Sequence, residues 1–402
     1  MNILQICSKM PYPPKDGGSI AMNSITEGLI KCSNQVTVLA INTPKLFIND
    51  ADIDSNYRKT THFQSVFIDT NVKPIPAFLN LFTNQSYHIV RFDSKTFEQT
   101  LIDVLQKQSF DIVQIESLLL SNYARVIRKY SKAKIVLRSH NVEYSIWERL
   151  AKKTANPLRA WYLRLLSKRL KKYEIEMMNH YDGIACITKL DALSYQQLGC
   201  QTPIITIPFG INLSNYRIQK TSTEIASVFH LGAMDWMPNA DAMKWFLNYV
   251  WPRVVEQHSE VKLYLAGRNM PTWLLQLSMP NVEIVGEVND AHQFINSKSI
   301  MVVPLSSGGG MRVKIIEGMA LAKLIISTTI GAEGIEYESM KNIIIANTAN
   351  EFVEAIHTCL TNSTLADAIA NNARQLAETN YDNQKICERL SEFYSQLLNA
   401  KK

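Results

Sequence analysis

The sequence predicts an α/β protein made of two doubly wound domains whose parallel sheets face each other across a cleft. Short apolar runs alternate with amphipathic segments along almost the whole chain, a pattern typical of parallel sheets with both faces covered by helices. The 402 residues are too many for one ordinary core and fit two domains of about 150 to 200 residues each. A polar stretch separates the strand candidates into two sets.

The strand candidates are β-rich runs bounded by helical segments. In the first half they are NILQIC, QVTVLAI, SVFID, FDIVQIE, KIVLRSH, GIACIT and PIITIP. In the second half they are SVFHLGA, KLYLAG, VEIVG, SIMVVPL, LIIST and NIIIA. The stretch between the sets predicts a linker at 208–227, which leaves a first domain at 1–207 and a second at 228–380. The apolar spacing of the last segment, 381–402, predicts a helix, which we expect to cross back to the first domain.

The composition describes a globular protein, with 46% apolar and 19% charged residues. A net charge of +6 is too mild over this length to indicate nucleic acid as a partner. Six scattered cysteines include no CxxC pair, and no His stands at metal-ligand spacing, so we expect a reducing compartment and no structural zinc. The N-terminus lacks a secretory pattern and no run of about 18 apolar residues occurs, so we expect a cytoplasmic location.

A glycine loop in the second half is the strongest candidate for a binding site. The stretch SIMVVPLSSGGGMRVKIIEGMALA predicts a strand, a loop and a helix in that order, with the three glycines at 308–310. Glycines let a backbone approach an anion closely, and the N–H groups at a helix start favour phosphate. Arg312 and Lys314 add full positive charge, and Glu317 on the helix could accept hydrogen bonds from two sugar hydroxyls. The loop could therefore hold a sugar nucleotide, or it could be a flexible turn before a helix with solvated charges.

The segment GGGMRVKIIEGMALAKLIISTTIGAEGI resembles the donor-binding segment of the large retaining bacterial glycosyltransferase family four. Supporting stretches are PYPPKDGGS, RSHNVEYSIWERL, IPFGINLSNY and LGAMDWMPNADAMKWF, and together they are similar to the subgroup that carries GGGxRxKxLE. The resemblance implies the GT-B architecture of two Rossmann-like domains. It also implies that Gly308, Gly309 and Gly310 hold the diphosphate of an activated sugar.

One acidic position departs from the family pattern. Family members often have two glutamates eight positions apart, the first near the donor sugar and the second on the nucleotide ribose. Glu317 matches the second, whereas Gly309 stands at the position of the first. The identity of the donor sugar is therefore open.

Two cationic positions also depart from it. The family pattern after the first strand of the second domain has an Arg and a Lys that neutralise the diphosphate, and here these positions are Ala233 and Pro238. Losing both charges would leave a dianion poorly paired. We hypothesise that Arg312 and Lys314 replace them from the facing loop and carry the electrostatic part of catalysis.

In the first domain, the candidate residues follow strands, as ligand-binding residues do in doubly wound sheets. Gly17 and Gly18 form a glycine-rich first loop, which could lie near the donor phosphate or could be a plain turn. His140 matches the family histidine beside the donor sugar, although a lone His is more often a packed or surface residue. The expected acceptor-side residues are Glu116, Asn141 and Glu143.

In the second domain, Gly232 and Arg268 follow strands, and we expect both near the donor. The resemblance implies that the loop around Val288 holds the nucleotide base through backbone contacts, which leave no trace of base identity. No DxD-type acidic cluster lies in a plausible donor loop. We therefore expect no obligatory metal and no cofactor besides the nucleotide-sugar substrate.

The segment 149–172, RLAKKTANPLRAWYLRLLSKRLKK, contains nine basic residues and no acid. Such a basic amphipathic helix suits an anionic membrane surface, where lipid-linked sugar acceptors are found. A solvated face with a buried apolar stripe explains the pattern equally well. Peripheral contact with the inner face of the cytoplasmic membrane is one of two open interpretations.

The expected function is transfer of a sugar from a nucleoside diphosphate sugar to a hydroxyl of a glycan or lipid-linked acceptor, with retention, in cell-surface polysaccharide synthesis. One alternative is a sugar-nucleotide epimerase of the same architecture, although acids are scarce near the glycine loop. Another is a degenerate sugar-nucleotide binder. The sequence does not determine the base, the donor sugar, the acceptor, the linkage or the oligomeric state.

Overall fold

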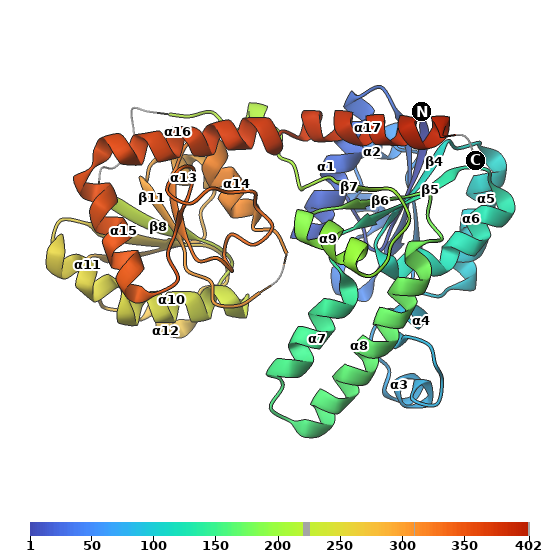
Figure 1. Cartoon of the computed structure of the whole chain (residues 1–402), viewed down its shortest axis with the longest axis horizontal. Coiled ribbons are helices and arrows are strands. Elements are labelled where there is room, and N and C mark those ends of the chain that lie inside the picture. The colour runs from blue at the N-terminus through green and yellow to red at the C-terminus, as the bar shows by residue number, and fades with distance from the viewer. Residues whose placement is uncertain (220–225, 309, 401–402) are drawn as a thin grey trace. The chain divides into compact units, whose positions relative to one another are not determined.

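The computed structural model describes residues 1–219, 226–308 and 310–400. The chain divides into two compact units (Figure 1). Unit 1 contains Met1–Gly210 and Asn383–Lys402, and unit 2 contains Ile211–Asp382. Each unit is built on one parallel sheet, which confirms the predicted fold class of two doubly wound, Rossmann-like domains.

The sheet of unit 1 has the strand order β3-β2-β1-β4-β5-β6-β7, and all its neighbouring strands are parallel. Its strands are β1 (Asn2–Cys7), β2 (Gln35–Asn42), β3 (Gln64–Phe67), β4 (Ile112–Glu116), β5 (Lys134–Ser139), β6 (Gly183–Cys186) and β7 (Ile204–Thr206). Every strand predicted in the first half of the chain is present. The order reverses direction at β1, because the chain runs from β1 to β2 on one side and reaches β4 on the other.

The helices of unit 1 cover both faces of this sheet. They are α1 (Gly17–Lys31), α2 (Ser55–Thr60), α3 (Pro74–Asn80), α4 (Tyr87–Val90), α5 (Lys95–Lys107), α6 (Ala124–Tyr130), α7 (Glu143–Lys153), α8 (Pro157–Met178), α9 (Lys189–Gln197) and α17 (Asn383–Asn399). Short 3-10 turns lie at η1 (Pro44–Leu46), η2 (Asp50–Asp52) and η3 (Leu118–Tyr123).

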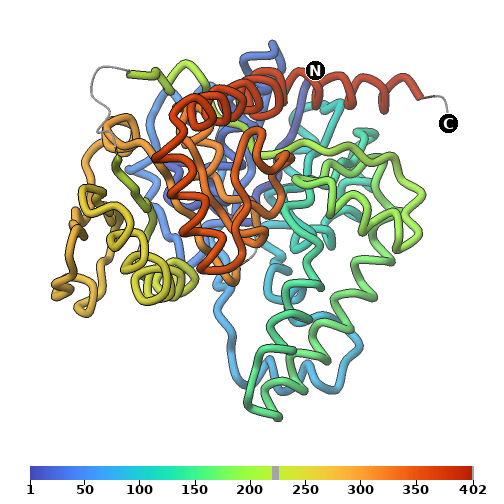
Figure 2. The backbone as a smooth tube through the Cα atoms, turned by 60° about the vertical axis from the view of Figure 1, so that its left-hand side comes forward, coloured from blue at the N-terminus to red at the C-terminus, as the bar shows by residue number. Residues whose placement is uncertain are grey.

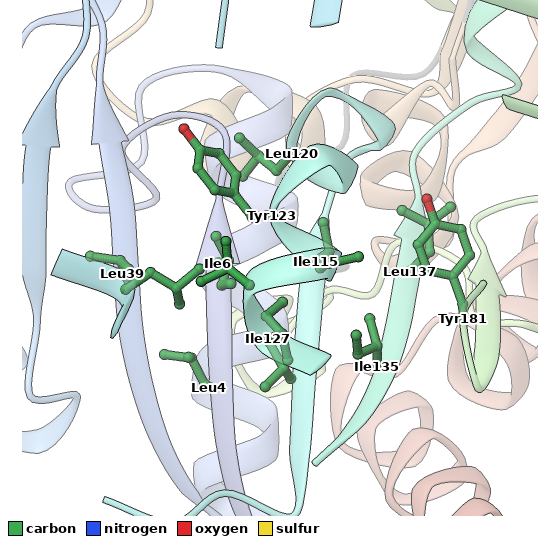
Figure 3. Packing of buried hydrophobic residues seen from close by; sticks show 14 of the residues in the cluster. Leu4, Ile6, Leu39, Ile115, Leu120, Tyr123, Ile127, Ile135, Leu137 and Tyr181 are labelled. Carbon is green, nitrogen blue, oxygen red and sulfur yellow. The ribbon is translucent and has the colours of Figure 1, made fainter. Parts of the chain in front are cut away.

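Alternate residues of each strand enter two separate cores. Ile3 of β1 packs with side chains of α1 and α17, whereas Leu4, its neighbour in sequence, packs with side chains of α5 and α6. Figure 3 shows the second of these cores, where Leu4 and Ile6 lie near Ile115 of β4 and Tyr123 of η3. Because adjacent side chains of a strand point to opposite faces, a strand buried on both sides is apolar throughout. This explains the continuous apolar runs of the sequence.

The basic segment 149–172 is not one helix, contrary to the prediction. It contains the end of α7 and most of α8, and the two helices are separated by 154–156. Pro157 causes the break, because proline lacks a backbone donor and disfavours helical geometry in the residue before it. Asn156 is accordingly extended, and its side chain accepts a hydrogen bond from the N–H of Arg159 to cap the new helix.

The C-terminal helix α17 belongs to unit 1, where it packs on α1. Asn383 donates a hydrogen bond to the carbonyl of Ser24 at 2.6 Å. Cys387, Leu390 and Tyr394 of the same helix are buried in the core that contains Ile3. Figure 2 shows α17 in red beside the N-terminal strand. The end of the chain therefore completes the first core.

The sheet of unit 2 has the order β10-β9-β8-β11-β12-β13 and is also parallel. Its strands are β8 (Ser227–Leu231), β9 (Lys262–Ala266), β10 (Val282–Gly286), β11 (Ile300–Val303), β12 (Leu324–Ser327) and β13 (Ile344–Ile345). Its helices are α10 (Met237–Tyr249), α11 (Trp251–Gln257), α12 (Thr272–Leu275), α13 (Ala291–Asn296), α14 (Val313–Ala320), α15 (Ala349–Thr361) and α16 (Ser363–Asn380), with a 3-10 turn at η4 (Leu213–Asn215).

The predicted linker, 208–227, lies partly outside the described residues, which omit 220–225. Its described residues from Ile211 onward belong to unit 2, and Tyr216 among them is buried. No helix in the described part of the chain is long and apolar enough to span a membrane.

Candidate active site

Unit 1 has a cleft of about 380 Å³ at the carboxyl ends of its central strands. The loops after β1, β4 and β5 all contribute to it, because the carboxyl ends of parallel strands meet at one edge of the sheet. It lies where the strand order reverses, between β1 and β4. Five of the predicted residues line it: Gly18, Glu116, His140, Asn141 and Glu143.

His140 and Glu116 form a close polar pair in this cleft. The Nε2 atom of His140 lies 2.7 Å from Oε2 of Glu116. Glu116 is the last residue of β4 and is only 1% exposed, whereas His140 follows β5 and is partly exposed. An ionised carboxylate only accepts hydrogen bonds, so it holds the His140 ring with the Nε2–H group toward itself and Nδ1 away from it. Glu116 therefore fixes the orientation of His140.

Other buried polar groups hold Glu116 in place. Its Oε1 atom accepts hydrogen bonds from Nε2 of Gln5 at 2.8 Å and from Nε2 of Gln114. The guanidinium of Arg138 lies 3.9 Å from Oε2, and the hydroxyl of Tyr394 on α17 donates to Gln114. The chain of contacts runs from the C-terminal helix to the cleft.

The pKa of Glu116 reflects this environment. Burial by itself raises the pKa of the carboxyl, but the hydrogen bond and charge of His140, the charge of Arg138 and the hydrogen bond from Gln5 together hold it below its ordinary value. Glu116 is therefore ionised at neutral pH.

Glu143 is the second acid of the cleft, at the start of α7. Burial raises its pKa to about 7, and the charges of Glu174 and Asp191 add to the effect. Glu174 on α8 accepts hydrogen bonds from the N–H groups of Glu143 and Tyr144, both at 3.2 Å, and thereby caps α7. A carboxyl with a pKa near neutrality can accept or release a proton at an acceptor hydroxyl.

The first glycine loop differs from the prediction in one respect. Gly17 and Gly18 do not precede α1 but form its first turn, and Asp16 caps the helix through the N–H of Ser19. Asp16 also pairs with Lys9 at 2.7 Å. A Cβ on Gly18 would lie 2.5 Å from Nζ of Lys9, so glycine leaves room for that lysine. The carboxylate of Asp16 thus lies at the start of α1, where the donor phosphate was expected. Gly17 is exposed and does not line the cleft.

In unit 2 the glycine loop joins β11 to α14, as predicted. Gly308 and Gly310 have φ angles of +113° and +85°, which side chains rarely allow; Gly309 lies outside the described residues. A Cβ on Gly308 would lie 3.0 Å from both Arg312 and Trp236. Arg312 is buried with its guanidinium 5.3 Å from the ring of Trp236, and it donates a hydrogen bond to the carbonyl of Gly310. The loop therefore wraps around Arg312.

Lys314 lies on the first turn of α14 and reaches the loop after β8. Its Nζ donates to Oδ1 of Asn239 at 3.0 Å and lies 3.3 Å from Nε2 of His230. A Cβ on Gly232 would come within 2.8 Å of this Nζ, so the glycine leaves space for the ammonium group. The strand order of unit 2 reverses between β8 and β11, so these residues lie at its switch point.

Burial and, to a lesser extent, the charge of Arg312 lower the pKa of Lys314 to about 7, against an opposite effect of Glu317. Burial and the charge of Lys314 hold the pKa of His230 well below its ordinary value, so its ring is neutral. Its Nδ1 lies 2.8 Å from the carbonyl of Val302, to which it donates. Nε2 is then the acceptor for Lys314. The two basic side chains, Lys314 and Arg312, lie together and form a ready site for a dianion.

Glu317 lies one turn further along α14. Its Oε1 atom accepts a hydrogen bond from the hydroxyl of Tyr216 at 2.9 Å. Tyr216 is held in turn, because Arg374 donates to its backbone carbonyl at 3.1 Å and His292 packs against its ring with centroids 4.3 Å apart. The carboxylate is therefore held through Oε1 by Tyr216.

The remaining donor-side candidates lie on neighbouring loops. Arg268 follows β9 and is exposed, and Val288 follows β10 and is partly buried. Gly267, which lies between the end of β9 and Arg268, has a φ angle of +144°. A Cβ at this position would lie 1.8 Å from the carbonyl oxygen of Gly232. This close approach brings the loops after β8 and β9 together. Among the described residues, no contact joins Arg268 to Lys314 or to Glu317.

Sequence reasoning missed the residues that support these groups. His230, Asn239 and Trp236 surround Lys314 and Arg312, and Tyr216 holds Glu317. His230 stands within an apolar strand, where a polar side chain needs a buried partner. The position of His230 in an apolar strand was therefore a signal in the sequence that it has a buried polar partner. No comparable signal marked Asn239 or Tyr216.

Comparisons with known proteins agree with this geometry. Residues 226–362 match the family model described as glycosyl transferases group 1. A curated relative, the uncharacterized 44.6 kDa protein in the cps region of Klebsiella pneumoniae, is 24% identical over 221 residues, which are 52% of this chain and 56% of the relative. The chain thus matches little more than half the length of that relative.

Solved structures resemble the whole chain. HepE (Alr3699) of Anabaena in complex with UDP has a TM-score of 0.68 and 14% identity, with 98% of this chain and 100% of HepE covered. Sucrose-phosphate synthase of Thermosynechococcus elongatus has a TM-score of 0.69 and 16% identity, with both chains covered completely. At such identities the likeness shows the fold.

The fold and the family match define the class of this protein. Residues 226–362 of unit 2 match the glycosyl transferases group 1 model, and the two parallel sheets give the chain the GT-B fold. In the described residues, no group of three or more His, Cys, Asp and Glu side chains is arranged to hold a metal ion.

Proposed function

We propose that the chain is a glycosyltransferase that moves a sugar from a nucleoside diphosphate sugar to a hydroxyl of a glycan or lipid-linked acceptor. The observation that carries the proposal is the joint position of Lys314, Arg312 and Glu317 at the switch point of unit 2. Two solved neighbours support the ligand class, namely HepE in complex with UDP and HepE in complex with UDP-glucose. The relative encoded in a cps region supports a role in cell-surface polysaccharide synthesis.

Unit 2 binds the donor in this proposal. Lys314, Arg312 and the N–H groups at the start of α14 face the diphosphate, and they stabilise the negative charge that develops as the sugar leaves. These two cations stand in for the Arg and Lys that the family pattern places at Ala233 and Pro238. Glu317 accepts hydrogen bonds from the ribose hydroxyls, and the loop around Val288 contacts the base.

The cleft of unit 1 binds the acceptor. His140, oriented by Glu116, and the partly buried Glu143 and Asn141 line the space for the acceptor hydroxyl and the transferred sugar. The bond between the anomeric carbon and the diphosphate oxygen breaks with its electron pair on that oxygen. The acceptor oxygen forms the new bond, and its proton passes to the departing diphosphate. We propose retention at the anomeric carbon and no obligatory metal, on the resemblance described above.

A thermal-shift panel of UDP-, GDP- and ADP-sugars tests the donor site. A ligand that binds the native state raises the melting temperature, so one nucleotide family is expected to stabilise the wild type. Glu317→Ala removes a charged hydrogen-bond acceptor and is expected to weaken binding by about tenfold or more. Glu354→Ala, at an exposed position of α15, serves as the matched control.

The outcomes separate this proposal from its alternatives. Stabilisation that is lost in Glu317→Ala but kept in Glu354→Ala supports the donor site and identifies the base. Absence of any shift would contradict it. Product analysis with the stabilising donor then distinguishes transfer, which needs an acceptor, from epimerisation, which does not, and from a binder, which gives neither.

A further inference from the structure

The short helix α3 of unit 1 exposes a cluster of large apolar side chains. Ile75, Phe78 and Leu79 of α3 and Phe82 just after it, here called the α3 patch, are between 59% and 78% exposed. The stretch 74–82 contains no charged residue. Soluble proteins seldom expose apolar side chains in such a contiguous group without a partner.

Contacts at both ends hold α3 in this position. On the N-terminal side, the N–H of Lys73 donates to the hydroxyl of Tyr87 on α4 at 3.2 Å. On the C-terminal side, the guanidinium of Arg169 on α8 donates to the carbonyls of Asn80 and Leu81, both at 2.9 Å. The helix is therefore anchored through polar backbone groups, and its apolar side chains are left to the outside.

The adjoining face of α8 extends this surface. Leu158, Trp161, Leu165 and Arg169 follow one another at spacings of three or four residues, which places them on one side of the helix. Leu158 and Trp161 are 78% and 57% exposed. Because Arg169 of the same face holds α3, the α3 patch and these two side chains belong to one region of unit 1. Figures 1 and 2 show α3 next to α8 where α7 and α8 protrude from the sheet.

Positive charge lies beside the apolar region, on α7 and α8. The segment 149–172 contains nine basic residues and no acid, and all of them except Arg169 are exposed. A second copy of the chain would bring the same positive charge to this surface and would be repelled. An anionic bilayer attracts lysine and arginine and accepts exposed aromatic and aliphatic side chains at its interface.

We propose that this surface of unit 1 binds an anionic membrane, with the α3 patch inserted into the interface and the basic residues of 149–172 on the lipid head groups. The patch enlarges the apolar contact that Leu158 and Trp161 of the basic segment offer. The inference extends the proposed function, because a lipid-linked acceptor would lie in the same membrane. Vesicle binding needs neither donor nor acceptor, so the two proposals fail independently.

Vesicle co-sedimentation of the full chain tests the proposal. The wild type is expected to bind vesicles that contain phosphatidylglycerol and to bind pure phosphatidylcholine vesicles far less. Phe78→Ser combined with Phe82→Ser is expected to lower the partition coefficient by at least about tenfold, because each change removes an aromatic ring from the interface. Arg164→Glu with Lys168→Glu is expected to abolish the preference for anionic vesicles.

The chain offers a matched control for the aromatic pair. Phe47 and Phe67 of unit 1 are 51% and 55% exposed and pack edge to face at 5.9 Å, much as Phe78 and Phe82 do at 5.6 Å. Serine at both control positions is expected to leave vesicle binding unchanged. Equal binding by the Phe78 and Phe82 variant, or no binding by the wild type, would overturn the proposal. Self-association that depends on the patch, without vesicle binding, would assign the surface to a second copy instead.

Discussion

Replacing Lys314 by methionine is expected to weaken binding of the nucleoside diphosphate by about thirtyfold below pH 7. The ammonium group lies beside Arg312 at the switch point of unit 2, partly out of water, where a hydrogen bond between charged groups contributes about 1.5 to 3 kcal/mol. Methionine keeps the length of the side chain and loses the charge. Isothermal titration with UDP, GDP and ADP measures the change for whichever nucleotide binds.

The pH dependence of this affinity is a sharper test than its magnitude. The pKa of Lys314 is lowered to about 7 in the free protein, whereas a bound diphosphate favours the charged form and raises it. As pH rises through about 7, the free protein loses the proton that binding requires, and wild-type affinity should fall by up to about tenfold per pH unit. Lys314→Met should show only the smaller change that comes from titration of the ligand phosphate itself.

Lys262→Met provides the control for Lys314→Met. Lys262 is exposed at the amino end of β9, at the opposite edge of the sheet from the glycine loop. Its loss should change neither the affinity nor the pH dependence. If Lys314→Met bound the nucleotide as tightly as the wild type at every pH, Lys314 would not be a diphosphate ligand.

The strands and the glycine loop could be predicted because local patterns determine them. A strand buried on both faces is apolar along its whole length, as in β1 and β4, and proline or glycine marks its ends. The order strand, glycines, helix at 300–320 needed no distant information. The break at Pro157 was also readable from a local rule, and it was overlooked because the basic residues continue on both sides of it.

The partners of the site residues could not be predicted because they come from distant parts of the chain. Glu116 is held by Gln5 and by Gln114, which in turn binds Tyr394, 280 residues further along. No local pattern marks such a buried polar pair, since each residue alone appears as one polar position in an apolar strand or helix. The same holds for Tyr216 and Glu317, 101 residues apart.

The α3 patch was missed for a different reason. An apolar run such as 74–82 is usually interpreted as core, because burial is the commonest fate of such residues. Its exposure follows from the way Arg169 and Tyr87 hold the backbone at either end, which only the assembled unit reveals. The basic segment was identified as a candidate membrane element, but its apolar counterpart lies about 80 residues earlier in the sequence.

Replacing Glu116 by glutamine is expected to lower the transfer rate, kcat, by about a hundredfold, at the lower end of what a positioned acid-base group contributes. The amide oxygen of glutamine would stay where Gln5 and Gln114 donate to Oε1, which turns its NH2 group toward Nε2 of His140. Two donors cannot bond to each other, so the ring must carry its proton on Nδ1 and present a donor to the cleft where the wild-type ring presents an acceptor. The variant also removes the buried negative charge beside the ring, so the shape of the pH-rate profile should change.

Three measurements separate this positioning role from simple damage to the fold. The melting temperature and the nucleoside diphosphate affinity of Glu116→Gln should remain near wild type, since the substitution preserves size and the donor site belongs to unit 2. Glu392→Gln, at an exposed position of α17, should leave kcat unchanged. Glu116→Asp restores the carboxylate at a shorter reach and should recover part of the rate and the wild-type profile shape. A Glu116→Gln protein with wild-type kcat and profile would mean that the buried carboxylate serves the stability of β4 and not the orientation of His140.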